Sequence, residues 1–302
     1  FPVEPPSLSI FRKRIGRKGE ERLLQETIKL GLKTGAVKAA DMKRITVDTT
    51  VQEKAVRFPT DTHLCSKARE ELVSLAAQYN VKLRQSYARK GKKAAFMANR
   101  YMAARQMKRG RKKIKEVCNY LGRVIRDIER ACKNNKLLQS SFKDALEKAN
   151  RIYAQTLNPK APNKLYSWHA PEVECIAKGK AYKKYEFGCK ASIASTNKSN
   201  FIVGAMAHHG KPYDGHTLKE VLKHVEEMTG IKPEESNVDL GYRGHGIKQE
   251  EEKHEVILAR QKRNMTPAKK RRQKRRNAIE PIIGHCKNDR AVGPRNWLKG
   301  ER

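Results

Sequence analysis

The chain has 302 residues, and its 67 Lys and Arg outweigh its 32 Asp and Glu to give a formal net charge of +35 at pH 7. Such an excess favours a polyanionic partner, and nucleic acid is the commonest one. A span of roughly 18 apolar residues, which a membrane helix needs, is absent from the sequence. The length suits one large domain or two modest ones.

The cysteine pattern excludes two common small-domain classes. Six cysteines are spread along the chain without a CxxC pair, which argues against a disulfide scaffold and against a zinc ribbon. We therefore expect reduced thiols in a cytoplasmic protein.

The N-terminal segment 7–33 predicts two short helices. Ser7 is a suitable N-cap, and Gly16 and Gly19 mark a break between the helices. The basic residues of this segment could contact phosphates, or the segment could be a plain helical hairpin. The sequence leaves both interpretations open.

A strand is predicted at 43–50, because apolar and polar residues alternate there. Asp48 lies on the polar face of this strand, near its end. A lone Asp at such a place is most often a turn or capping residue. The following residues, 51–61, are predicted to form an extended loop closed by Pro59.

Residues 62–156 have a helical pattern throughout and no strand-like run. Between Val81 and Tyr120 there are fourteen Lys and Arg and a single acid, Glu116, with aromatic residues interleaved. A solvated basic face is the alternative, but so many uncompensated charges favour a helical insertion that follows DNA phosphates. The predicted phosphate-binding residues are Arg105, Lys108, Arg109, Arg111 and Lys112.

After a proline-containing linker at 157–171 the pattern becomes that of a sheet. A polar turn joins an alternating run and a second, more buried strand into a hairpin, and a helix with one apolar face follows it. Asp239 stands at the end of a short strand and precedes a glycine-rich turn. The predicted elements are strands at 183–196, 201–207, 236–240 and 255–259 and a helix at 214–230.

The stretch from Lys269 to Lys287 begins as a cationic run and then turns apolar around one acid, Glu280. Helical spacing places Arg276, Glu280 and Lys287 on one face. Pro281 cannot donate a backbone hydrogen bond, so a helix must kink or begin there. Glu280 is either a counter-ion or a metal ligand beside a phosphate site.

Other polar residues could contribute to a site. His208, His209 and His216 lie near Asp214 in sequence, but their spacing does not support a separate metal site. His285 could contact DNA. Tyr242 and Arg243, which follow Asp239, could shape the site or merely complete a turn.

The element order predicts an α/β fold in which a mixed sheet is flanked by helices, with a large basic all-helical insertion after the first strand. We expect an N-terminal helical segment at 1–40 and a catalytic domain at 41–302, interrupted by the insertion at about 62–156. Acids at the carboxyl ends of strands are where open α/β folds place their chemistry.

Five blocks of the sequence resemble the DDE transposases of bacterial insertion sequences, whose catalytic domain is RNase H-like. The blocks are VDTTVQEKAVRFPTD, the hairpin containing YEFG, GAMAHHGKPYDGHTL, VDLGYRG and AIEPIIGHCK. The resemblance covers the chain from about residue 7 to 300. The family carries more sequence at both ends, so it implies a truncated chain and a truncated DNA-binding region at 1–40.

The resemblance implies a catalytic, metal-binding triad of Asp48, Asp239 and Glu280. It also implies a Tyr, an Arg and a Lys at fixed spacings around the Glu; Arg276 and Lys287 match, whereas Gln273 replaces the Tyr. Leu240 stands where many relatives have a basic residue. Arg276, Lys287 and Arg243 are the expected phosphate contacts of this site.

The implied activity is metal-dependent phosphodiester cleavage and strand transfer at the ends of an insertion sequence. Two Mg²⁺ or Mn²⁺ ions about 4 Å apart would serve both displacements. The implied partners are the terminal inverted repeats and target DNA, with a homodimer assembled on DNA and no membrane. The alternatives are a non-catalytic basic DNA-binding fragment of a decayed transposase and an RNase H-like nuclease.

Overall fold

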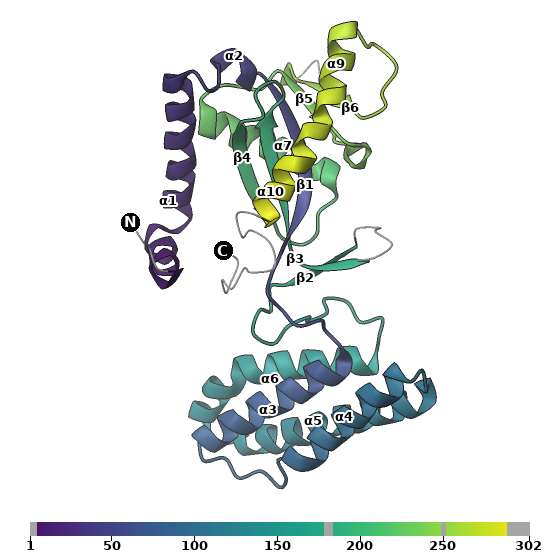
Figure 1. The fold of residues 1–302 in the computed structure, drawn as a ribbon. Coiled ribbons are helices and arrows are strands. Elements are labelled where there is room, and N and C mark those ends of the chain that lie inside the picture. Colours follow the sequence, from purple (N-terminus) through teal and green to yellow (C-terminus); the bar gives the residue numbers. More distant parts are fainter. Residues whose placement is uncertain (1–4, 178–183, 249–251, 289–302) are drawn as a thin grey trace. The chain divides into compact units, whose positions relative to one another are not determined.

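The computed structural model describes residues 5–177, 184–248 and 252–288 (Figure 1). The chain divides into two compact units. One unit combines Phe1–Ala55 with Glu174–Arg302, and the other is Val56–Val173. The insertion predicted at about 62–156 therefore forms most of a unit of its own, which begins and ends slightly outside the predicted limits.

The first unit is built on a mixed six-stranded sheet. Its strands are β1 (Arg44–Glu53), β2 (Glu174–Ala177), β3 (Tyr185–Thr196), β4 (Ile202–His208), β5 (Glu235–Val238) and β6 (Glu255–Leu258). The order is β2-β3-β1-β5-β6, and β4 also pairs with β3. β1 is antiparallel to β3 and parallel to β5, which is in turn parallel to β6. The predicted mixed sheet is confirmed.

Helices of this unit pack on the sheet. They are α1 (Pro5–Thr34), α2 (Ala39–Met42), α7 (Asp214–Thr229), α9 (Pro267–Arg275) and α10 (Ile279–Asn288), with 3₁₀ turns η1 (Leu240–Tyr242) and η2 (Arg276–Ala278). Apolar residues of α1, α7, β1, β4 and β5 form one core. Gly16 interrupts α1 with a φ of 57°, as the sequence predicted. α7 ends at Gly230 in the left-handed conformation, also as predicted.

Two predictions about the strands were wrong. β1 does not end at residue 50 but continues to Glu53, because its last residues pair with β3 as far as Gly188. β2 was not predicted at all, and it pairs with the first residues of β3. The prediction that a helix kinks or begins near Pro281 is confirmed. The 3₁₀ turn η2 separates α9 from α10, and α10 begins two residues before Pro281.

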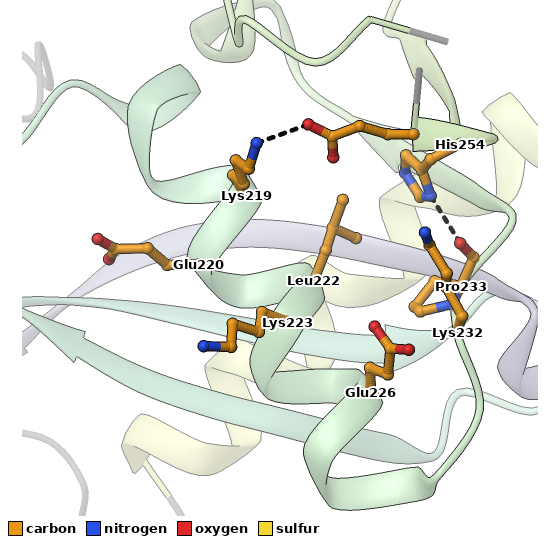
Figure 2. Close-up of a pocket in the computed structure, with 9 residues that line it drawn as sticks. Lys219, Glu220, Leu222, Lys223, Glu226, Lys232, Pro233 and His254 are labelled. Carbon is orange, nitrogen blue, oxygen red and sulfur yellow. Dashed lines mark hydrogen bonds and ion pairs between the residues drawn. The ribbon is translucent and has the colours of Figure 1, made fainter. Parts of the chain in front are cut away.

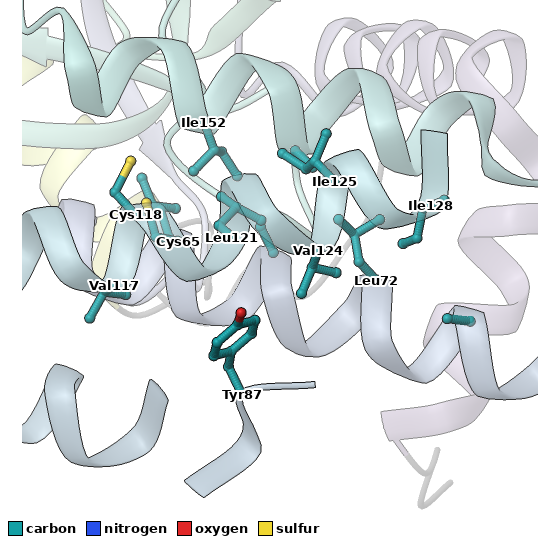
Figure 3. Packing of buried hydrophobic residues seen from close by; sticks show 14 of the residues in the cluster. Cys65, Leu72, Tyr87, Val117, Cys118, Leu121, Val124, Ile125, Ile128 and Ile152 are labelled. Carbon is teal, nitrogen blue, oxygen red and sulfur yellow. The ribbon is translucent and has the colours of Figure 1, made fainter. Parts of the chain in front are cut away.

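The second unit is a bundle of four helices, shown in Figure 1: α3 (Asp61–Gln78), α4 (Ala88–Ala103), α5 (Met107–Cys132) and α6 (Lys136–Leu157). Its hydrophobic core includes Leu72 of α3, Leu121 of α5 and Ile152 of α6, which are labelled in Figure 3. The prediction of an all-helical insertion is confirmed.

The segment predicted as a linker at 157–171 instead packs on this bundle. Leu165 is fully buried, and the side chain of Gln155 exchanges two hydrogen bonds with the Leu165 backbone, at 2.9 and 2.7 Å. Trp168 packs against the same core. Burial of these residues makes the segment part of the unit, which extends to Val173.

None of the helices in the described residues combines the length and the apolar character that a membrane span needs.

Candidate functional site

Two of the three predicted acids occupy corresponding places on neighbouring parallel strands. β1 pairs with β5 so that Thr46 stands opposite Asn237. Carrying this register two residues further along both strands brings Asp48 beside Asp239, which directly follows β5. Both side chains are half-buried. The pairing of β1 with β5 therefore places two carboxylates, 191 residues apart in sequence, next to each other on the sheet.

Asp48 belongs to the face of the sheet on which α9 lies. Side chains alternate along a strand, so Asp48 shares the face of Thr46 rather than that of the buried Ile45 and Val47. On this face the Asn197 amide donates to the Thr46 hydroxyl (3.0 Å) and to the Arg272 carbonyl oxygen (3.1 Å). Residues of the 196–200 turn and of α9 are thereby fixed to β1.

A buried ion pair holds α9 to the same face. The guanidinium of Arg272 donates twice to the Glu235 carboxylate, at 2.7 and 2.6 Å. The Glu235 side chain is 7% exposed, so removing one partner would leave a buried charge unpaired. This bidentate contact joins α9 to the start of β5. It therefore fixes the segment that directly precedes α10, the helix that carries Glu280.

Glu280 lies in the first turn of α10, a helix that contacts β1. Ile279 is fully buried and anchors this turn. The Glu280 carboxylate is 65% exposed and lies 3.7 Å from the Arg276 guanidinium. Lys287, predicted on the same face as Glu280, lies 3.8 Å from the buried Glu186 of β3. The cations expected to flank Glu280 are thus divided between two carboxylates.

A further acid that sequence reasoning did not select, Asp214, lies beside Asp239. A Cβ atom at Gly241 would lie 3.0 Å from Asp239 Oδ1 and 3.2 Å from Asp214 Oδ2, so both carboxylates border the same small space. Asp214 is the first residue of α7, and Lys190 on β3 donates to it at 2.8 Å. An acid in a first helical turn is common, and only its position in the fold distinguishes Asp214.

Tyr242 is buried at the centre of these acids. Its hydroxyl has no hydrogen-bond partner among the described residues. Burial raises the pKa of Tyr242, and the carboxylates of Asp48, Asp214 and Asp239 raise it further. The phenol therefore stays protonated and can donate towards an oxygen atom. Tyr242 is also the last residue of the 3₁₀ turn η1, and its role in shaping the site stays a prediction.

The type of donor at this place fits Mg²⁺ or Mn²⁺, because the groups are carboxylate and hydroxyl oxygens without thiol ligands. Asp48, Asp239 and Glu280 are the residues that could hold the ions, with Asp214 adjacent. Among the described residues, no three His, Cys, Asp or Glu side chains are gathered closely enough to hold a metal ion. The Glu280 carboxylate lies beside the Arg276 guanidinium instead.

Two of the histidines near Asp214 in sequence, His208 and His209, have other polar neighbours. His208 is buried and its Nε2 lies 2.9 Å from the Ser192 hydroxyl, while His209 Nδ1 lies 3.7 Å from Cys189 Sγ. Burial lowers the pKa of His208. His208 thus supports Ser192 next to Tyr242 as a neutral side chain.

A shallow cavity of about 400 Å³ lies elsewhere on the first unit (Figure 2). α7 supplies Lys219, Lys223 and Glu226 to its lining, and Glu252 and His254 line it as well. Lysines and glutamates balance there, and a Lys219–Glu252 ion pair of 2.7 Å crosses it. This balance does not suit a polyanion, and none of the predicted site residues lines the cavity.

The predicted phosphate-binding residues of the second unit lie on its surface. Arg105, Lys108, Arg109, Arg111 and Lys112 are all exposed, at the start of α5 and just before it. The carboxylate of Glu116, the acid of this region, accepts hydrogen bonds from Lys113 at 2.6 Å and from the Tyr120 hydroxyl at 2.7 Å. Arg243 of the first unit is exposed as well. The cationic surface therefore remains available to an anion.

Acidification should destabilise the first unit through His254. Its Nδ1–H donates to the Pro233 carbonyl oxygen (2.8 Å) and its Nε2 accepts from the Ser236 hydroxyl (2.9 Å). Burial lowers the pKa of His254, so below the unfolded value of about 6.5 the unfolded chain binds the extra proton. The free energy of unfolding should then fall by up to about 1.4 kcal/mol per pH unit.

Urea unfolding between pH 7 and 5 measures this dependence. His254→Gln should reduce the slope of unfolding free energy against pH, and His216→Gln, which removes an exposed histidine of α7, is the control. Equal slopes for His254→Gln and the unmodified chain would show that His254 does not carry the effect.

Comparison with known proteins identifies a similar protein without an assigned activity. An uncharacterized protein, ORF8 in the nfe locus of Rhizobium meliloti, is 44% identical over 105 residues, which are 35% of this chain and 51% of that protein. The chain thus spans about half the length of this relative. No protein family matches the chain, and no solved structure matches it.

Proposed function

We propose that this chain is a DNA transposase of the DDE type, which cleaves and joins DNA at the ends of an insertion sequence. The observation that carries the proposal is the register of β1 and β5, which sets Asp48 beside Asp239 on one face. Glu280 enters from α10, a helix that contacts β1. Three acids that are distant in sequence therefore lie on, or directly after, two paired strands and on a helix that contacts one of them.

The order of the strands supports an RNase H-like core. Three antiparallel strands, β4, β3 and β1, are followed by two parallel strands, β5 and β6. The first acid lies on the central strand and the second on the neighbouring parallel strand, with a helix between β4 and β5. This arrangement agrees with the resemblance of the five sequence blocks to DDE transposases.

The residues of the site suit in-line displacement at phosphorus. A pair of Mg²⁺ or Mn²⁺ ions, when bound, would activate the attacking oxygen and stabilise the leaving one. Asp48 and Asp239 would hold them from rigid strands, and Glu280 would complete the set after its side chain turns from Arg276. Arg276 is then free to contact a phosphate oxygen with charge-assisted hydrogen bonds.

The surroundings of the acids also favour an anionic substrate accompanied by cations. Tyr242 remains protonated at any physiological pH, because burial and three carboxylates raise its pKa. Its hydroxyl can donate to a carboxylate or to a water molecule on an ion. Lys190 neutralises Asp214, which limits repulsion among the acids in the absence of metal.

Assays of cleavage and of joining test the proposal. The substrate is a duplex that carries the inverted repeats flanking the coding frame, with Mg²⁺ or Mn²⁺ added, and EDTA is the control. Nicking at the repeat end followed by joining to a target duplex supports a transposase. Nicking without joining identifies the RNase H-like nuclease, and binding without nicking identifies the non-catalytic fragment.

The exposed cations of the second unit should dominate the salt dependence of DNA binding. Changing Arg105, Lys108, Arg109, Arg111 and Lys112 together to Ala should reduce the slope of log affinity against log salt by up to about 4.5, since each phosphate contact contributes about 0.9. Fluorescence anisotropy with a duplex at several NaCl concentrations measures this slope.

A control set from the same unit separates local contacts from net charge. Lys133, Lys136 and Lys143 are also exposed, but they lie outside the basic stretch at 81–120. Their triple Ala variant should leave the slope nearly unchanged. An unchanged slope for the five-residue variant would show that its side chains form only a solvated face.

A further inference from the structure

The aromatic residues of the basic region have different environments. Tyr87 is buried and stacks on Tyr120 with ring centroids 4.6 Å apart, and the Arg123 guanidinium lies 5.8 Å from the centre of the Tyr87 ring. Tyr101 is half-buried, with the Arg109 guanidinium 6.0 Å from its ring centre. The rings of Tyr87 and Tyr101 therefore already contact other side chains of the same unit.

Phe96, in contrast, is 61% exposed in the middle of α4. The buried face of this helix consists of Gly91, Ala94 and Ala98, so the bundle is closed by small residues and does not need the phenyl ring. A large aromatic side chain turned to solvent loses the free energy of its burial. Its position is explained if a ligand covers the ring.

The charges around Phe96 identify the class of ligand. Helical spacing places Arg89, Lys92, Lys93 and Arg100 on the face of Phe96, at positions i−7, i−4, i−3 and i+4. All four are exposed, and α4 contains no acid. Within the described part of the chain, no ion pair engages these four cations. An exposed aromatic ring with cations on the same helix face suits nucleic acid as a ligand. Its phosphates can pair with the cations, and the flat face of a base can stack on the ring.

We infer that α4 binds single-stranded DNA, with an unpaired base stacked on Phe96 and the flanking phosphates on Lys92, Lys93 and Arg100. Stacking platforms within a cationic surface are the usual means of binding unpaired nucleic acid. Duplex bases expose only their edges, so a ring on a straight helix gains contact with a base face only where pairing is opened. The inference rests on the proposed DNA-binding role of the second unit.

Base-dependent affinity tests this assignment directly. The probes are a fluorescein-labelled thymidine 16-mer and an abasic strand of equal length, which has the same phosphates without bases. The chain should bind the thymidine strand about 5- to 150-fold more tightly than the abasic strand, the value of one stacked base. Phe96→Ala should abolish this difference and leave the affinity for the abasic strand unchanged.

Three variants separate stacking from packing and from general hydrophobicity. Phe96→Tyr should retain the preference, and Phe96→Leu, which keeps apolar area without a π face, should lose most of it. Leu137→Ala removes a side chain that is 70% exposed on α6 of the same unit, and should have no effect. The salt slope of binding should be equal for Phe96→Ala and the unmodified chain, because no charge changes.

The outcomes distinguish this inference from the proposed function. Equal binding of the two strands by the unmodified chain overturns stacking but retains phosphate binding by the basic surface. Binding of neither strand overturns both the inference and the DNA-binding role of the second unit. A loss on Phe96→Ala that is confined to duplex DNA also overturns the assignment to unpaired bases.

Discussion

Asp239→Asn is expected to reduce DNA cleavage by several orders of magnitude while DNA affinity stays unchanged. The substitution removes a negative charge where a metal ion would be held at the transition state, and a rate factor of ten corresponds to about 1.4 kcal/mol. The basic surface of the second unit is untouched by the change. Single-turnover cleavage in Mg²⁺ and anisotropy binding in EDTA measure the two properties separately.

The fold should tolerate this substitution. Asp239 is the N-cap of η1, where Oδ1 accepts a hydrogen bond from the Gly241 N–H at 2.8 Å. The amide oxygen of Asn can accept the same bond, and Asn is as good an N-cap as Asp. Removing one of three neighbouring carboxylates should also leave the thermal stability without metal equal or higher. Asp41→Asn, on α2 of the same unit, is the control.

A loss of cleavage that follows the loss of folded protein would contradict this expectation. Asp239 would then be a structural cap only. Cleavage by Asp239→Asn at nearly the unmodified rate would exclude the residue from the chemistry. The proposal would then lose the strand pair on which it depends.

Local patterns in the sequence were sufficient to predict elements whose residues contact their own neighbours. The alternation around Ile45 and Val47 predicted β1, and the turn before Phe201 predicted the β3–β4 hairpin. Gly230 ended α7 because a glycine adopts the left-handed conformation without steric cost. Such elements depend on residues close in sequence, which a pattern can capture.

Elements that depend on distant partners were missed. The last residues of β1 form a strand because β3, more than 130 residues later, extends far enough to pair with them. Leu165 lies in a proline-containing segment that resembles a linker, yet Gln155 and the bundle core bury it. Neither partner lies close in sequence, so a local sequence pattern could not predict the pairing of β1 with β3 or the burial of Leu165.

The candidate site shows the same division. Asp48, Asp239 and Glu280 were selected partly through the resemblance to a family, and strand register then brought the two aspartates together. Asp214 could not be selected from sequence, because an acid at a helix start usually stabilises the helix dipole. Its place beside Asp239 depends on the packing of α7 against η1.

Glu280→Gln separates a catalytic role of this acid from a structural one. The carboxylate is 65% exposed and its ion pair with Arg276 is long, at 3.7 Å. Exposed pairs of this kind contribute about 0–1 kcal/mol. The variant should therefore keep nearly the same free energy of unfolding, since Gln retains the volume and much of the hydrogen-bonding capacity.

A ligand role predicts a large effect on a different quantity. Cleavage by Glu280→Gln should fall by several orders of magnitude, because one carboxylate of the metal site is lost. DNA affinity should persist or rise slightly, because Arg276 no longer has a carboxylate beside it. Single-turnover cleavage, anisotropy binding and urea unfolding of the same preparation measure the three quantities.

Glu227→Gln is a matched control, because Glu227 is also exposed, at 56%, and also forms a long helical pair, 3.8 Å from Lys223. Its cleavage rate should equal that of the unmodified chain. If Glu280→Gln cleaves as well as this control, Glu280 is a counter-ion and Asp214 becomes the remaining candidate for a third carboxylate. Asp214→Asn, which frees Lys190, would then have to abolish cleavage, and without that effect the chain is a DNA-binding protein lacking catalysis.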